Sequence, residues 1–154
     1  MSNPRLSYDD FRALAPAAYA ALIGLGKSTH DAGLDDDLAE LVKVRASQIN
    51  GCAFCLQLHL NRARALGVAA ARLDMVAVWR DAGLFSEREA AALAWTEALT
   101  RLAGEAEKDE AWAAVRVHFS EAHAAALTVA IAGINAWNRI AGPLRFAPPV
   151  EARR

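Results

Sequence analysis

The sequence predicts an all-α fold in a single domain, and three observations support this. Alanine and leucine are abundant, which favours helices, and no stretch keeps an alternation of apolar and polar residues with a period of two. The 154 residues match the size of one ordinary domain, without an internal repeat or a linker. Hydrophobic residues make up 55% of the chain, which is enough for a core without a disulfide framework. We therefore treat residues 1–154 as one domain.

Capping and stop signals mark the expected helix boundaries. The acidic cluster 35–37 suits a helix N-terminus, because carboxylates cap free backbone N–H groups and favour the helix dipole. Ser86 and Glu89 have the spacing of a capping box, and Gly67 suits a helix stop. The expected helices cover residues 7–33 with a break near Pro16, the segment from the acidic cluster to about 50, residues 52–66, 69–82, 86–104 and 109–119, and a last helix from 120 towards Gly142 and Pro143.

The last of these helices is apolar nearly all round. Leu127, Val129 and Trp137 lie on different faces of it, and such a helix is buried in a large core or against a partner chain. Because the apolar content is high for a lone small protein, we expect a homo-oligomer. The uncharged run 122–138 is shorter than the roughly 20 apolar residues that a membrane-spanning helix needs. No membrane partner is therefore expected.

Composition narrows the class of function. The net charge is -1, which favours neither nucleic acid nor an anionic membrane as a partner. The N-terminal stretch MSNPRLSYDD lacks a basic start followed by an apolar run, so no signal peptide is expected. We therefore expect a cytoplasmic location. The tail, with Pro148, Pro149 and two terminal arginines, is expected to be loose.

The segment SQINGCAFCLQLH, residues 47–59, holds both cysteines of the chain. On a helix, Cys52, Cys55 and His59 fall within roughly 60° of one another and share a face. Cys52 would sit in the first turn, where free N–H groups and the positive dipole end favour a thiolate. His59 lies one turn beyond Cys55, close enough to exchange a proton. The geometry is that of a redox dithiol, in which one thiolate attacks and the other closes a disulfide.

A carboxylate on the preceding helix is expected to join this group. If the two helices form a hairpin with a short turn near Asn50 and Gly51, residues equally far from the turn lie opposite each other. Glu40 then faces His59. A glutamate beside a histidine in a partly dry pocket holds the imidazole in place and tunes its pKa.

Each of these residues also has a plainer interpretation. The cysteines could be two buried thiols, and Glu40 could be a solvated helix residue. Cys52, Cys55 and His59 could supply three zinc ligands, but there is no second cysteine pair, and the other three histidines lack a matching spacing. We interpret His118 and His123 as surface or packing residues.

The chain resembles the carboxymuconolactone decarboxylase superfamily, and within it the alkylhydroperoxidase D-like (AhpD-like) branch. The matching pattern is Glu40, Cys52 twelve residues later, Cys55, and His59 four residues after Cys55, within ELVKVRASQINGCAFCLQLH. The segments LAWTEALT, residues 93–100, and INAWNR, residues 134–139, are also similar to this branch. The resemblance covers most of the chain, with a catalytic core at about residues 36–82.

The resemblance implies an all-helical AhpD-like fold that forms homo-oligomers, commonly trimers or hexamers. It implies a peroxidase or disulfide reductase that works on a small hydroperoxide with an external dithiol reductant, without metal, haem or flavin. Carried over, Cys55 attacks the peroxide, Cys52 closes the disulfide, and Glu40 and His59 form a proton relay. The best-known members have a histidine just before the second cysteine, where this chain has Phe54.

Two other functions remain open. A lyase acting on a lactone, of the carboxymuconolactone decarboxylase type, would use His59 and Glu40 and would work with both cysteines replaced by serine. A non-catalytic oligomeric redox sensor would toggle the Cys52–Cys55 disulfide and turn over peroxide slowly. We expect the thiol peroxidase, with a role in antioxidant defence.

Overall fold

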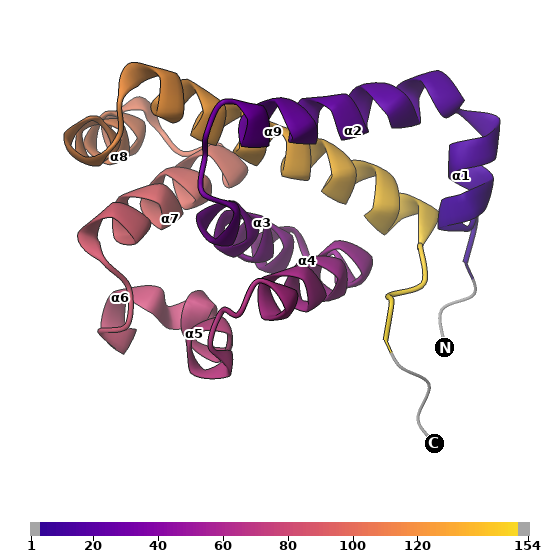
Figure 1. The fold of residues 1–154 in the computed structure, drawn as a ribbon, viewed down its shortest axis with the longest axis horizontal. Coiled ribbons are helices and arrows are strands. Elements are labelled where there is room, and N and C mark those ends of the chain that lie inside the picture. The colour runs from indigo at the N-terminus through magenta and orange to yellow at the C-terminus, as the bar shows by residue number, and fades with distance from the viewer. Residues whose placement is uncertain (1–3, 151–154) are drawn as a thin grey trace.

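In the computed structural model, which describes residues 4–150, every regular element of the described part is helical (Figure 1). The helices are α1 (Tyr8–Leu14), α2 (Pro16–Asp31), α3 (Asp36–Asn50), α4 (Ala53–Ala65), α5 (Ala70–Met75), a 3₁₀ turn η1 (Val76–Val78), α6 (Trp79–Ala82), α7 (Glu87–Thr100), α8 (Glu105–His118) and α9 (Glu121–Leu144). The all-α single domain is confirmed.

Several predicted boundaries are confirmed by their caps. The first helical region is broken at Pro16, which is the first residue of α2. Ser86 and Glu89 form the expected capping box at the start of α7. The acidic cluster does begin α3, but the Asp35 side chain does not cap it and instead pairs with Arg88.

The single helix expected at 69–82 is wrong, because the segment divides into α5, η1 and α6. Leu73, Val76 and Trp79 belong to one apolar cluster against α3, at a spacing of three residues. A 3₁₀ turn has three residues per turn and so keeps residues with this spacing on one face. Packing against α3 therefore explains the departure from a regular α-helix.

The boundary between the next two helices is also corrected. Helix α7 ends at Thr100 and not near Gly104, because Leu102 adopts a left-handed conformation with φ 54° and the N–H of Ala103 closes back onto the carbonyl of Ala98 at 2.9 Å. Gly104 is the N-cap of α8, which starts at Glu105 and not near residue 109.

Helix α3 occupies the centre of the molecule (Figure 1). It packs against α4, α7 and α9, and Leu41, Val42, Val44 and Ala46 are fully buried. A helix that is buried nearly all round can carry a polar side chain only where a partner satisfies it. The buried polar residues of α3, namely Glu40, Arg45 and Ser47, therefore each need a polar partner from another part of the chain.

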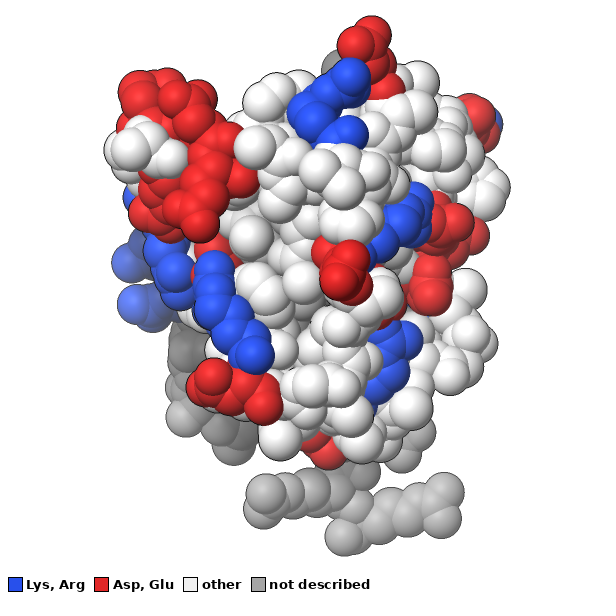
Figure 2. All heavy atoms as spheres, turned by 90° about the vertical axis from the view of Figure 1, so that its left-hand side faces the viewer, with Lys and Arg blue, Asp and Glu red and all other residues white. Residues whose placement is uncertain are grey.

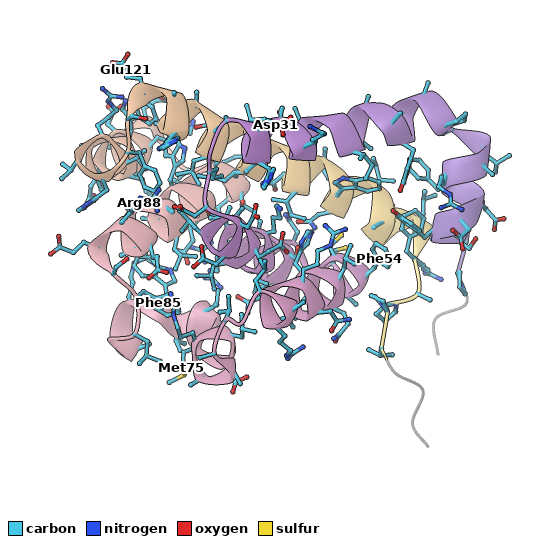
Figure 3. The ribbon with its side chains drawn as sticks, viewed as in Figure 1. Asp31, Phe54, Met75, Phe85, Arg88 and Glu121 are labelled. Atoms are coloured by element: carbon cyan, nitrogen blue, oxygen red, sulfur yellow. The ribbon has the colours of Figure 1, made fainter. Side chains whose placement is uncertain are left out.

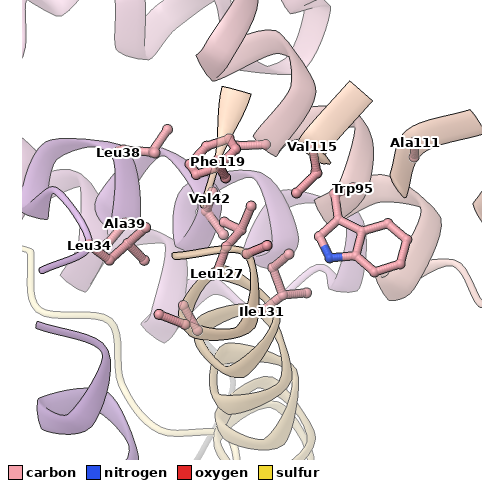
Figure 4. Close-up of a cluster of buried hydrophobic side chains, with 14 of the residues drawn as sticks. Leu34, Leu38, Ala39, Val42, Trp95, Ala111, Val115, Phe119, Leu127 and Ile131 are labelled. Carbon is pink, nitrogen blue, oxygen red and sulfur yellow. The ribbon is translucent and has the colours of Figure 1, made fainter. Parts of the chain in front are cut away.

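The largest apolar cluster joins α3, α7, α8 and α9 (Figure 4). Val42 of α3, Trp95 of α7 and Val115 of α8 meet Leu127 and Ile131 of α9 there. From the sequence, either the core or a partner chain could cover α9, and in the structure the core of the chain itself covers most of its apolar residues. The expected oligomer therefore cannot be inferred from α9.

Helix α2 carries one exposed apolar surface, with Ile23 and Leu25 on it. This helix runs alongside α9 (Figure 1), and Thr29 is its one buried residue. Residues 13–26 carry no charge, and the side chain of Ile23 is 44% exposed. No helix in the described part of the chain is long and apolar enough to cross a membrane.

Glu97 of α7 is a buried carboxylate held by three groups from two other helices, α3 and α6. It accepts hydrogen bonds from Arg45 Nε at 2.7 Å, Trp79 Nε1 at 3.0 Å and Arg80 Nη1 at 2.6 Å. Only 1% of Glu97 and 8% of Arg45 are exposed, so each charge depends on the other. On the face of the molecule drawn in Figure 2, charges of both signs lie interspersed among uncharged residues, without a broad basic field.

Replacing Glu97 tests whether this ion pair stabilises the junction of α3, α6 and α7. Glu97→Gln leaves Arg45 charged and buried, so we expect the free energy of unfolding to fall by about 3–5 kcal/mol. The exposed pair of Arg116 and Glu121 is the control, and Glu121→Gln should change the value by less than about 1 kcal/mol. Urea denaturation measures both. Equal, small losses in the two variants would contradict the assignment.

Candidate functional site

The turn between α3 and α4 sets the position of the dithiol. Gly51 ends α3 in the left-handed conformation with φ 66°, which glycine adopts without steric cost. The N–H of Cys52 then donates to the carbonyl of Ser47 at 3.1 Å. The next residue, Ala53, begins α4, so the hairpin expected from the sequence is present with a very short connection.

Cys52 is the N-cap of α4. Its sulfur accepts a hydrogen bond from the backbone N–H of Cys55 at 3.3 Å, in the way that a serine or aspartate oxygen caps a helix. Both cysteines are free thiols and each is 2% exposed. The hydrogen bond from the Cys55 thiol, and then that from the Cys55 N–H, lower the pKa of Cys52 to about 7, although burial opposes them.

The same pairing acts in the opposite direction on Cys55. Its thiol hydrogen-bonds the Cys52 sulfur, and this contact, burial and the Cys52 charge all raise the pKa of Cys55. Cys52 is therefore the sulfur that ionises first, and Cys55 keeps its proton; with a pKa of about 7, Cys52 is partly thiolate at neutral pH.

Glu40 and His59 meet across the hairpin as expected. His59 Nδ1 lies 2.6 Å from Glu40 Oε2, and Lys43 Nζ donates to Glu40 Oε1 at 2.8 Å. Burial alone raises the pKa of Glu40, but the hydrogen bond and charge of His59, followed by those of Lys43, hold it at about 2. Burial lowers the pKa of His59 against the opposing effect of Glu40. The neutral imidazole thus donates from Nδ1 and leaves Nε2 able to accept a proton.

A cavity of about 290 Å³ opens onto one of the two sulfurs. Cys55 and His59 line it, whereas Cys52 lies behind them and does not. Its other walls are mainly apolar residues of α1, α2, α4 and α9, and three cationic side chains also border it, namely Lys27, Lys43 and Arg62. The cavity therefore presents Cys55, beside a proton acceptor, to a ligand.

Aromatic side chains form the end of the cavity near the dithiol. Tyr8 stacks on Phe54 with ring centroids 5.3 Å apart, and its hydroxyl lies 3.0 Å from that of Tyr19. Figure 3 shows Phe54 at the start of α4, near the C-terminal part of α9. Burial, with the hydrogen bond of Tyr19, raises the pKa of Tyr8 to about 12, so the phenol stays neutral. In place of a relay histidine, the chain thus carries an aromatic wall.

The structure brings all four predicted residues together and keeps the other histidines away. His30 pairs with Asp36 at 2.7 Å, and His118 lies 4.0 Å from Glu87. Among residues 4–150, no group of three or more His, Cys, Asp or Glu side chains is arranged to hold a metal ion. Sequence reasoning missed the walls of the cavity, because Tyr8 and Trp137 are far from the motif in the chain and carry no spacing signal.

The tail was expected to be loose, and part of it has a defined contact. Asn61 of α4 donates to the carbonyl of Pro149 at 3.0 Å. Residues 151–154, with the two terminal arginines, lie outside the described residues.

Comparisons with known proteins agree with the fold and the motif. The family model of the carboxymuconolactone decarboxylase family matches residues 16–98. The uncharacterized protein YdfG of Bacillus subtilis (strain 168) is 34% identical over 138 residues, which cover 90% of this chain and 92% of that protein.

Solved structures give the same result. A protein of unknown function from Agrobacterium tumefaciens, described as a candidate antioxidant defence protein AhpD, is 36% identical with a TM-score of 0.89, covering 97% of this chain and all of that one. An uncharacterized peroxidase-related protein from Ralstonia eutropha JMP134, described as an alkylhydroperoxidase AhpD core, shares the fold at 24% identity and a TM-score of 0.71, over 90% of this chain and 74% of that one. The chain belongs to the carboxymuconolactone decarboxylase family, and its structural relatives are AhpD-like.

Proposed function

We propose that the protein is a thiol-dependent peroxidase that reduces organic hydroperoxides with the Cys52–Cys55 pair. One observation carries this proposal: Cys55 and His59 line the same cavity, whereas Cys52, the more acidic thiol, does not line it. A buried dithiol of purely structural use would need neither a cavity nor a histidine oriented by a carboxylate.

The chemistry follows from the shared proton of the pair. Transfer of the Cys55 proton to Cys52 or to His59 Nε2 makes Cys55 a thiolate facing the cavity. That sulfur attacks the outer oxygen of ROOH, the O–O bond breaks, and the departing RO⁻ takes a proton to give ROH. Cys55 is then a sulfenic acid, which Cys52 attacks to form the disulfide and release water. An external dithiol returns the two electrons and the two protons.

The apolar lining suggests the class of peroxide. Leu22, Ile134 and Trp137 are among the residues that line the cavity, and a ligand that buries apolar surface there would gain about 25 cal/mol per Å². Hydrogen peroxide has no such surface. We therefore propose an alkyl or aryl hydroperoxide as the substrate. The volume of about 290 Å³ admits a small one.

A lyase is the second candidate, because the Glu40–His59 pair also borders the cavity and could remove a proton from a lactone without either cysteine. Replacing both cysteines by serine distinguishes the two chemistries. The peroxidase loses all turnover in this variant, whereas the lyase keeps it.

We also propose that the protein forms a homo-oligomer, most simply a trimer or hexamer as in its relatives' branch, and that α2 supplies the contact. This helix is uncharged from its start to Gly26 and leaves Ile23 and Leu25 exposed, which supplies an apolar face for a second copy. No metal, haem or flavin is needed for the proposed reaction, and the cytoplasm would supply the dithiol reductant.

Peroxide treatment provides the test of the proposed function. The reduced protein should lose two hydrogens on reaction with one equivalent of cumene hydroperoxide, because the two sulfurs join, and a dithiol should restore its mass. With excess dithiol the protein should turn over the peroxide continuously. Mass spectrometry and dithiol consumption measure the two results. A protein that keeps both thiols alkylatable after this treatment is not a peroxidase of this kind.

Replacing the relay residues should slow peroxide reduction without changing the fold. His59→Ala removes the proton acceptor and Glu40→Gln removes the group that orients it, so each should lower kcat/KM by roughly 10²- to 10⁴-fold. The double variant should lose less than the product of the two, since the residues act as one unit. His118→Ala, on α8 and outside the cavity, is the control. Full activity in both single variants would remove Glu40 and His59 from the mechanism.

Assembly can be tested on the exposed face of α2. Ala21→Arg places a charge on a residue that is already exposed in the protomer, so folding should be unaffected while an apolar contact with a second copy is disrupted. Light scattering should report the wild type as a multiple of 16.5 kDa and the variant as a smaller species. A wild-type protein that is monomeric at micromolar concentration would refute the oligomer.

A further inference from the structure

A buried amide of α9 lies beside the dithiol. Ile134, Asn138 and Ala141 share one face of this helix, and Ile134 and Ala141 pack in the same apolar cluster as Cys52 and Cys55. Asn138 is 4% exposed and donates to Ser47, whose carbonyl accepts from the N–H of Cys52, and hydrogen bonding by its side chain lowers the pKa of both cysteines. A primary amide in such a cluster is costly unless each of its polar atoms has a partner.

The orientation of the Asn138 amide depends on that of Asn135, one turn earlier on α9, whose own hydrogen-bond partners fix which atom is oxygen and which is nitrogen. Asn135 Nδ2 donates to the carbonyl of Ile131 at 2.9 Å, and Asn135 Oδ1 accepts from Arg139 Nη1 at 2.9 Å. A carbonyl can only accept and a guanidinium can only donate, so the orientation of Asn135 is fixed from both sides.

Asn50 connects Asn135 to Asn138 by hydrogen bonds, so the orientation of Asn135 also fixes that of Asn138. Asn50 Nδ2 donates to Asn135 Oδ1 at 2.9 Å and to Asn138 Oδ1 at 2.8 Å. Because Oδ1 of Asn138 faces Asn50, its Nδ2 must face the other way, where it donates to Ser47 Oγ at 3.1 Å. One N–H of Asn138 remains for a second acceptor, and the helix face that carries Asn138 packs against Cys52 and Cys55 through Ile134 and Ala141.

We propose that this remaining N–H of Asn138 binds the thiolate sulfur of the reduced pair, and that Arg139, through Asn135 and Asn50, is a positioning residue that keeps the N–H directed at it. The inference deepens the proposed function, since it assigns a residue that sets how strongly the dithiol is oxidising. Neither residue belongs to the motif of Glu40, Cys52, Cys55 and His59.

The consequence for the redox cycle has a definite sign. Reduction of the disulfide by an external dithiol breaks the S–S bond, delivers two electrons and leaves one sulfur as a thiolate. A hydrogen bond to that thiolate stabilises the reduced state, so it lowers the thiol pKa and raises the reduction potential of the pair. The same contact holds Cys52 in position for its attack on the sulfenic acid of Cys55.

Few other ionisable groups surround the pair. His59 follows one turn later on α4, with Glu40 and Lys43 of α3 behind it. Tyr8 of α1 lines the cavity and hydrogen-bonds Tyr19 of α2, and Arg62 of α4 is exposed. None of these groups belongs to the amide chain, so a change in Asn138 or Asn50 leaves them in place.

The test measures the pKa of Cys52 and the reduction potential of the pair in variants of the amide chain. Asn138→Leu removes the donor, and we expect the pKa of Cys52, from the pH dependence of iodoacetamide alkylation, to rise by about one unit. A tenfold loss of thiolate stabilisation corresponds to a potential about 30 mV lower in a dithiol–disulfide redox buffer. Asn50→Ala and Arg139→Gln, both at exposed positions, should shift the two values in the same direction by smaller amounts.

Controls separate this effect from packing. Ile134→Val alters the same apolar cluster without an amide, and Arg116→Gln removes a surface guanidinium on α8, so neither should move the pKa or the potential. Unchanged values in Asn138→Leu, or an equal shift in Ile134→Val, would overturn the inference. If Asn138→Leu does not fold, unchanged values in both Asn50→Ala and Arg139→Gln overturn it instead. A wild type that fails to reduce peroxide, with the shifts present, would refute the proposed function and support this inference.

Discussion

The short turn at Gly51 is the constraint on which the site depends. Because glycine tolerates the left-handed conformation, α3 can end at Gly51 and α4 can begin two residues later. The end of α3 and the start of α4 therefore lie side by side. The positions of the four motif residues follow from this. Cys52 falls at the N-cap, Cys55 one turn into α4, and Glu40 opposite His59. A longer connection would free the register of the hairpin and separate the carboxylate from the imidazole.

The hairpin also divides two requirements between the two thiols. A peroxide-reducing thiol must be accessible, and a resolving thiol must be ionised at the moment when the sulfenic acid appears. The N-cap position gives Cys52 hydrogen-bond donors and a lowered pKa but encloses it, while Cys55 keeps its proton and faces the cavity. From its place in the first turn of the helix, Cys52 was expected to be the thiolate. From the resemblance to the family, Cys55 was expected to attack the peroxide. A single proton shared by the two sulfurs makes the two assignments compatible.

The local part of the structure could be predicted from the sequence, and the part that depends on distant contacts could not. Glu40, Cys52, Cys55 and His59 lie within twenty residues, so helix periodicity and a turn signal were enough to bring them together. The break of the predicted helix 69–82 depends on packing of Leu73 and Val76 against α3, which no local pattern reveals. Similarly, the apolar helix α9 could have faced a partner or the core, and only the fold shows that the core covers it while Ile23 and Leu25 of α2 stay exposed. Tyr8, Trp137 and Asn138 reach the site through tertiary packing alone.

Trapping of the sulfenic acid tests the central claim most directly. With Cys52→Ser, one equivalent of cumene hydroperoxide followed by a dimedone-type reagent should label Cys55 in peptide mass spectra, because no resolving thiol remains. With Cys55→Ser, Cys52 should remain unlabelled at the same exposure, since it does not line the cavity. Labelling of Cys52 in the second variant, with Cys55 unlabelled in the first, would contradict the assignment of the attacking sulfur to the cavity-facing thiol.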